Sequence, residues 1–274
     1  MDERDLLSRQ EPAPQAPASP PDSASSVDEV KGVVIAEEPV TSLIRPTGIG
    51  LLDINLEGGL PAGSVIYFSA GAGSMSEVFL YQFSSSRKTY YFTTSRRPRY
   101  IAQNITDTSF DVSNIVFIDI YSQYYLDKFG EMIDNVGNEF VDKEIIDFME
   151  YQLKNIQAKK GEEFNIIIDT FSFFLGLNVN FGKILRLVNL IYEITKDTQA
   201  LSYLYVIKDA HDDRAENEIK NLCDTVFNVE LERVGERMAN KLSITKIRGR
   251  IAPVDMLKFK IMHGVQMDTS RDIA

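Results

Sequence analysis

Short apolar runs recur along the chain from about residue 41 onward, and each ends in glycine or in polar residues. Strands buried on both faces of a parallel sheet have this pattern, because neither face alternates with solvent. We therefore predict five such strands, at residues 64–70, 88–95, 114–121, 164–174 and 201–209.

Amphipathic segments separate these strands. The clearest lies near residues 138–160, where apolar residues recur every three or four positions and so share one helix face. Its members are Val141, Ile145, Met149, Leu153 and Ile156. Shorter helices are predicted at 77–87, 100–109 and 183–196. Alternating strands and helices are typical of a parallel sheet covered by helices.

The pattern changes beyond residue 224. Residues 225–234, 239–249 and 256–262 resemble successive antiparallel strands joined by short polar turns. The predicted fold class is therefore α/β, a three-layer domain over residues 41–274 with a mainly parallel central sheet and a C-terminal antiparallel β-hairpin extension. Residues 1–40 are rich in proline, alanine and serine. Such a segment buries too little surface to offset its ordering entropy, so we predict a disordered tail.

The 274 residues carry a formal net charge of −11, which gives no global attraction to nucleic acid or to an anionic membrane. The single cysteine, Cys223, excludes an intramolecular disulfide framework and a cysteine-rich metal site, and we predict no metal. No apolar run approaches the roughly 18 residues that span a bilayer. The first ten residues lack the features of a secretory signal. A reducing cytoplasm is the expected compartment.

Residues 46–74 read PTGIGLLDINLEGGLPAGSVIYFSAGAGS. This stretch resembles the entry segment of RecA-superfamily ATPases of the KaiC and RadA type. In that family Thr-Gly, Leu-Asp, Gly-Gly and Pro-x-Gly precede the first core strand. The matching residues are Thr47, Gly48, Leu52, Asp53, Gly58, Gly59, Pro61 and Gly63.

Later segments resemble the same family. Residues 93–95, TTS, are similar to its TTE; residues 164–174 are similar to its Walker B strand; and 246–250, KIRGR, are similar to its Lys-x-Arg-Gly. The resemblance implies a RecA-like P-loop NTPase fold. The chain also resembles divergent KaiC-like proteins of archaea, which are often linked to signalling and regulation.

The phosphate-binding loop departs from the family pattern G-x-x-x-x-G-K-[ST]. Ala70, Met75, Ser76 and Glu77 stand at its four defining positions. Gly71, Gly73 and Ser74 remain, and the resemblance makes Asp169 the magnesium-side aspartate. Ser95 stands where the family has the glutamate that positions the attacking water.

These changes have physical consequences. Ser76 cannot replace a cationic donor, and Met75 carries a β-carbon where the loop favours glycine. Glu77 places a carboxylate where a polyphosphate would lie, and two like charges about 4 Å apart repel by roughly 4 kcal/mol at an effective dielectric near 20. Because Ser74 precedes Glu77 by three residues, the segment also predicts a capping box at the helix start.

The leading hypothesis is a pseudo-ATPase without a cofactor that acts through protein association in regulation or signal transduction. The expected partner is a second copy or a paralogous RecA-like ATPase. The alternative is an active or nucleotide-gated RecA-like ATPase with an unusual loop. Its ATP and magnesium would bind at Gly71, Gly73, Ser74, Ser76, Glu77 and Asp169, but ATP is not favoured as a cofactor. Two glycines alone also fit an ordinary strand-to-helix turn.

Lys246 and Arg248 match a family pair that reaches across a subunit boundary toward a neighbour's terminal phosphate. They could complete a partner's site in this way, or they could be solvated charges on an exposed strand. A further hypothesis is an accessory DNA recombination protein that binds through Arg96, Arg97 and Arg99. Nucleic acid is not favoured, because non-specific binding needs several phosphate contacts.

Overall fold

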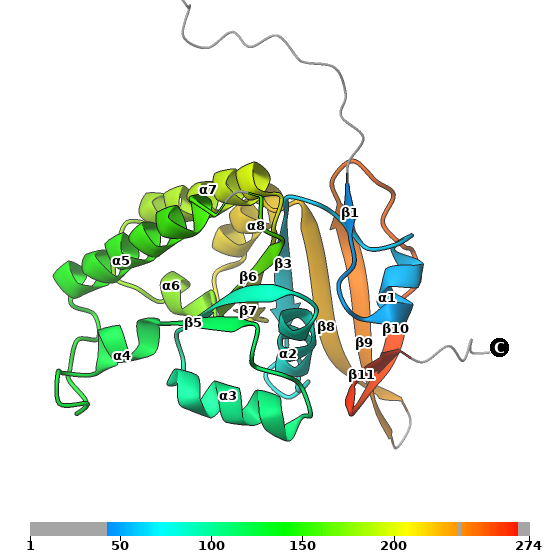
Figure 1. Ribbon diagram of the computed structural model, residues 1–274, viewed down its shortest axis with the longest axis horizontal. Helices are drawn as coiled ribbons and strands as arrows, with labels where there is room; N and C mark the ends of the chain where they lie inside the picture. Colours follow the sequence, from blue (N-terminus) through cyan, green and yellow to red (C-terminus); the bar gives the residue numbers. More distant parts are fainter. Residues whose placement is uncertain (1–42, 160, 235–236, 268–274) are drawn as a thin grey trace, which may run out of the picture. The chain divides into compact units, whose positions relative to one another are not determined.

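The computed structural model describes residues 43–159, 161–234 and 237–267. The predicted tail at residues 1–40 lies outside them. Within the described residues a nine-stranded sheet has the order β11-β10-β9-β8-β3-β7-β6-β4-β5 (Figure 1). Its strands are β3 (Ser64–Ala70), β4 (Lys88–Thr93), β5 (Ile115–Asp119), β6 (Phe164–Asp169), β7 (Leu201–Ile207), β8 (Thr225–Val234), β9 (Arg237–Ile247), β10 (Leu257–Met262) and β11 (Gly264–Met267). A separate pair joins β1 (Ile44–Arg45) to β2 (Leu60–Pro61).

The six strands from β8 to β5 in this order run parallel, and β9, β10 and β11 continue the sheet antiparallel. Every residue of β3 is buried, as expected for a central strand covered on both faces. The predicted mixed sheet with a C-terminal antiparallel extension is therefore confirmed.

Helices cover both faces of the sheet. They are α1 (Gly50–Asn55), α2 (Glu77–Ser85), α3 (Pro98–Asp107), α4 (Ile120–Tyr125), α5 (Glu139–Gln157), α6 (Ser172–Leu175), α7 (Phe181–Thr198) and α8 (Asp213–Leu222). Buried side chains of α4 to α8 share one core with the sheet, and those of α1 to α3 share the other. Figure 1 shows α5, α7 and α8 together on one side. The three-layer arrangement is therefore confirmed.

Several predicted boundaries are wrong. The strand predicted over 164–174 ends at Asp169, and residues 172–175 form α6 instead. The strand predicted over 114–121 ends at Asp119, whose carboxylate accepts the Ser122 N–H and caps α4. The sequence did not predict α8. In the two strands, the apolar run continues past the residue where the backbone leaves the extended conformation. Helix α8 was missed because its residues are mainly polar. None of the described helices is both long and apolar enough to cross a membrane.

Candidate functional site

The loop between β3 and α2 lies at the carboxyl end of the central strand. Its first turn is closed by Ser74, whose N–H and hydroxyl both donate to the Gly71 carbonyl, at 3.0 and 2.6 Å. A β-carbon at Gly71 would meet no atom within 4 Å, and one at Gly73 would only reach Leu231 at 3.9 Å. Neither glycine is required by crowding, which fits an ordinary strand-to-helix turn.

The predicted capping box is wrong. The helix begins at Glu77, and Ser76 occupies the N-cap position without a side-chain hydrogen bond to the helix. Ser74, the residue predicted to cap, donates to Gly71 within the loop instead. The hydroxyl of Ser74 bonds to Gly71 within the loop, and the hydroxyl of Ser76 contacts Tyr205 in the core. Neither serine therefore caps the helix.

Met75 adopts a left-handed backbone conformation with φ of +50°, and its side chain is 56% exposed. Glycine adopts this region freely, whereas a side chain is strained there. The prediction that this position favours glycine is therefore confirmed. The strain is tolerated because the surrounding turn is fixed on both sides by hydrogen bonds.

Ser76, which the resemblance aligns with the lysine of G-x-x-x-x-G-K-[ST], points into the protein. Its hydroxyl lies 3.1 Å from the Tyr205 hydroxyl of β7, and both residues are buried. Burial is the main reason why the pKa of Tyr205 is raised, so Tyr205 stays a neutral hydrogen-bonding group. The Ser76 side chain is therefore part of the core and does not face outward from the loop.

Glu77 is the first residue of α2 and is only partly exposed. A carboxylate in the first turn of a helix is stabilised by the helix dipole, by about 0.3–1 kcal/mol at an exposed site. Its charge contributes to raising the pKa of Tyr81, Asp169 and Tyr205, after burial in each case. The charge of Glu77 therefore influences the titratable side chains beneath the loop.

Asp169 ends β6 and is 7% exposed. Its Oδ2 accepts a hydrogen bond of 2.8 Å from the Tyr91 hydroxyl of β4. Burial raises the pKa of Asp169 to about 6, whereas the Tyr91 hydrogen bond and the charge of Arg96 lower it. The carboxyl group is thus held between neighbouring strands.

Ser95, which the resemblance aligns with a glutamate, is exposed. Thr94, the preceding residue, is buried and links the ends of β4 and β6. Its hydroxyl donates to the Thr170 carbonyl at 3.0 Å and accepts the Thr170 N–H at 2.7 Å. The carboxyl ends of β4 and β6 are therefore tied together beside Asp169.

Lys246 contacts the end of α8. Its ammonium group donates to the carbonyls of Lys220, Asn221 and Cys223, at 2.9, 3.0 and 2.6 Å. Burial and the nearby charge of Arg248 lower its pKa. Because the last carbonyls of a helix lack intrahelical partners, a cation there stabilises the helix.

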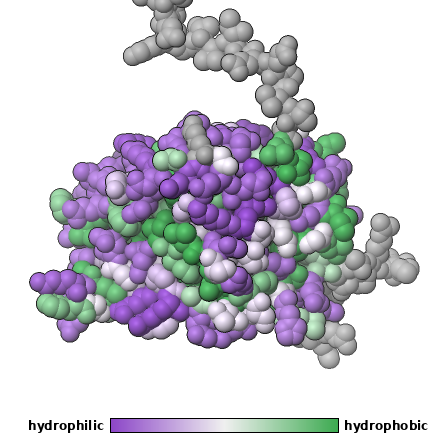
Figure 2. All heavy atoms as spheres, in the orientation of Figure 1, coloured by the Kyte–Doolittle hydropathy of each residue, from purple (hydrophilic) through white to green (hydrophobic). Residues whose placement is uncertain are grey.

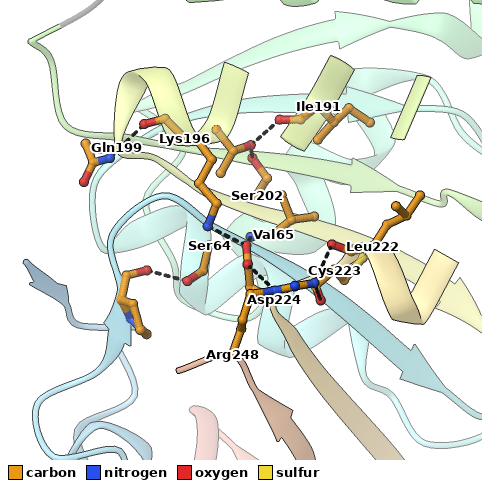
Figure 3. Close-up of polar contacts among 12 residues, drawn as sticks. Ser64, Val65, Ile191, Lys196, Gln199, Ser202, Leu222, Cys223, Asp224 and Arg248 are labelled. Atoms are coloured by element: carbon orange, nitrogen blue, oxygen red, sulfur yellow. Dashed lines mark hydrogen bonds and ion pairs between the residues drawn. The ribbon is translucent and has the colours of Figure 1, made fainter. Parts of the chain in front are cut away.

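Arg248 contacts the same helix end, through the carbonyls of Asn221, Leu222 and Cys223 at 3.0–3.3 Å. Figure 3 shows Leu222 and Cys223 beside Arg248. Its Nε also lies 3.1 Å from Oδ1 of Asp224, at an angle that makes an ion pair and not a hydrogen bond. Figure 3 shows Asp224 between Arg248 and Lys196.

Asp224 was not predicted. It is 3% exposed, and its Oδ2 accepts from the Val65 N–H at 3.0 Å and from Lys196 at 2.9 Å. It precedes β8, so this cluster lies where β3 and β8 begin, at the opposite ends of these strands from the loop. Lys246 and Arg248 are therefore not brought together with the chain's own loop residues.

The entry segment has structural roles. Asp53 accepts the N–H groups of Thr47 and Gly48, at 2.6 and 3.2 Å. At Gly59, φ is +134° and a β-carbon would lie 2.1 Å from the Arg45 carbonyl oxygen. These residues of the entry segment therefore fix the backbone conformation of the chain before β3.

The comparisons with known proteins give one family. Residues 44–274 match the model of the family of unknown function DUF7125. The chain belongs to this family. No curated protein matches it.

A solved structure has the same fold. It is that of a KaiC-like protein from the hyperthermophilic archaeon Pyrococcus horikoshii OT3, with a TM-score of 0.63 and 17% sequence identity. The match covers 84% of this chain and 100% of that one. The DUF7125 chain therefore has a RecA-like fold similar to that of KaiC-like proteins, as the resemblance of residues 46–74 implied.

Proposed function

We propose that this protein is a RecA-fold pseudo-ATPase that neither binds nor hydrolyses nucleotide and acts through protein association in regulation or signalling. The observation that carries the proposal is the inward contact of Ser76 with Tyr205. A phosphate-binding loop needs backbone N–H groups, a lysine and a magnesium-binding hydroxyl that face the anion. In this loop the residue at the lysine position faces the core, and a carboxylate follows it.

The remaining residues do not fit a magnesium nucleotide either. An aspartate on the magnesium side has to be accessible, whereas Asp169 is buried and its Oδ2 accepts the Tyr91 hydroxyl. The exposed Ser95 has no carboxylate with which to orient water. Glu77 adds electrostatic repulsion toward a triphosphate. Each of these features argues against nucleotide chemistry at this loop.

A contribution of Lys246 and Arg248 to a partner's site stays a prediction. Each side chain contacts three carbonyls at the end of α8. To reach another subunit, each would have to give up these contacts.

The test compares ATP binding, measured by calorimetry with magnesium, in three proteins. The native protein is expected to show no binding tighter than about 1 mM, which corresponds to about −4 kcal/mol. The double variant Ser76→Lys, Glu77→Thr restores the two lost groups and is expected to bind measurably. Ser113→Lys, Glu193→Thr makes the same charge change at exposed sites outside the loop and is expected to bind no better than the native protein. Micromolar binding by the native protein would contradict the proposal.

A further inference from the structure

Two connections on the carboxyl side of the sheet are tied to one buried carboxylate. The α4–α5 arm comprises residues 126–138, and the α6–α7 loop comprises residues 176–180. Helix α4 follows β5 and helix α6 follows β6, and both strands run parallel to β4. The two connections therefore leave the sheet from the same edge, which is the edge where open α/β sheets bind their ligands.

Asp142, in the first turn of α5, is fully buried. One of its carboxylate oxygens accepts the Tyr124 hydroxyl of α4, and the other accepts the Asn178 N–H of the α6–α7 loop at 2.7 Å. Burial, and after it the hydrogen bond to Asp142, raises the pKa of Tyr124, so this hydroxyl keeps its proton and donates. A carboxylate suits this position because its two oxygens accept donors from two different segments.

Two asparagine side chains connect the arm to the same group. The Asn178 amide donates to the Gly137 carbonyl of the arm at 3.2 Å. The Asn135 amide of the arm donates to the Tyr124 carbonyl at 2.8 Å. These hydrogen bonds and the chain between them form a closed ring, the Asp142 ring, whose members are Tyr124, Asn135, Gly137, Asp142 and Asn178.

The rest of the arm is loosely held. It projects from the sheet at the lower left of Figure 1, and Figure 2 shows hydrophilic and hydrophobic side chains intermixed there. Phe129 is 77% exposed and Val136 71%, and the Gly130 carbonyl accepts an exposed hydrogen bond from Arg97 at 2.9 Å. Segments with few buried apolar contacts open locally at a small cost in free energy. The contacts of the Asp142 ring therefore control how often the arm opens.

We propose that Asp142 couples the α4–α5 arm to the α6–α7 loop, so that the two segments open and close as one unit. Opening of the loop leaves one buried oxygen of Asp142 without its donor, which costs more free energy than a hydrogen bond contributes when it forms. Opening of the arm breaks the Asn178 contact that holds the loop. Because coupling is reciprocal, a molecule that fixes one segment also stabilises the other.

Hydrogen–deuterium exchange of the full chain tests the coupling. Asp142→Asn keeps the shape of the side chain but replaces one acceptor by a donor, which then faces the Asn178 N–H or the Tyr124 hydroxyl. Exchange is expected to rise about tenfold or more in both segments. The control Asp147→Asn lies at an exposed position of the same helix and is expected to leave both segments unchanged.

Asn135→Ala tests the coupling from the arm. It removes the contact with Tyr124 and is expected to raise exchange several-fold in the arm and also in the α6–α7 loop. Lys128→Ala, at an exposed arm residue outside the Asp142 ring, is expected to leave the loop unchanged. Amides of α8 are expected to keep their exchange rates in every variant, which separates local opening from a general loss of stability.

Circular dichroism checks that each variant is folded, and Asn135→Ala decides the question if Asp142→Asn does not fold. Faster exchange confined to one of the two segments would overturn the proposal. An equal rise throughout the chain would overturn it as well.

Discussion

Replacing Asp169 by asparagine is expected to stabilise the protein at neutral pH. The pKa of this buried carboxyl is raised from 3.8 to about 6 in the folded chain. The carboxyl therefore favours folding only where it is protonated, and that contribution is lost as the pH rises from 3.8 through about 6. The difference corresponds to about 3 kcal/mol, at 1.36 kcal/mol for each pH unit. Asparagine stays neutral and can still accept the Tyr91 hydroxyl.

The measurement is urea unfolding followed by far-UV circular dichroism at pH 4 and pH 7.5. The chain has no tryptophan, so fluorescence is less useful. The stability of Asp169→Asn relative to the native protein is expected to rise by about 2–3 kcal/mol between the two pH values. Asp147→Asn, at an exposed side chain 3.9 Å from Lys143, serves as the control and is expected to change by less than about 0.5 kcal/mol. An equal effect of Asp169→Asn at both pH values would refute the reasoning.

Three further predictions concern single residues. Met75→Gly relieves the strained φ of +50° at an exposed side chain and is expected to raise the unfolding free energy by about 0.5–1 kcal/mol in urea titrations; a loss would contradict the strain. Lys246→Met removes three contacts at the end of α8 and is expected to cost about 2 kcal/mol, against less than about 0.5 for Lys143→Met at an exposed pair; equal costs would exclude the capping role. Cys223 is fully buried and burial raises its pKa to about 12, so a thiol reagent should label it only after unfolding; rapid labelling of the folded protein would be inconsistent with its burial.

The parallel core could be predicted because its strands carry a continuous apolar signal. Each residue of β3 is buried, and the long helix α5 repeats its apolar residues on one face. Helix α8 was missed because its pattern is mainly polar, with Glu216 and Ile219 as its buried residues. The one available signal was Asp212, whose carboxylate accepts two N–H groups at the helix start.

The loop could be predicted only in part. The departure of residues 70–77 from the pattern G-x-x-x-x-G-K-[ST] is plain in the sequence, and so is the unfavourable Met75. The spacing of Ser74 and Glu77 fits a capping box, but local sequence does not show which residue begins the helix. Ser76 finds its partner, Tyr205, 129 residues away, and a tyrosine in an apolar strand looks like an ordinary core residue. Contacts that depend on strand order cannot be inferred from spacing alone.

The central claim is that the loop between β3 and α2 is closed onto the core and has no place for a triphosphate. A crystal structure of the native protein, grown with millimolar ATP and magnesium, tests this most directly. We predict that the Ser76 hydroxyl stays within hydrogen-bonding distance of Tyr205, with no nucleotide on the loop. Density for ATP against the start of α2, with Glu77 turned away and Ser76 released, would contradict the claim.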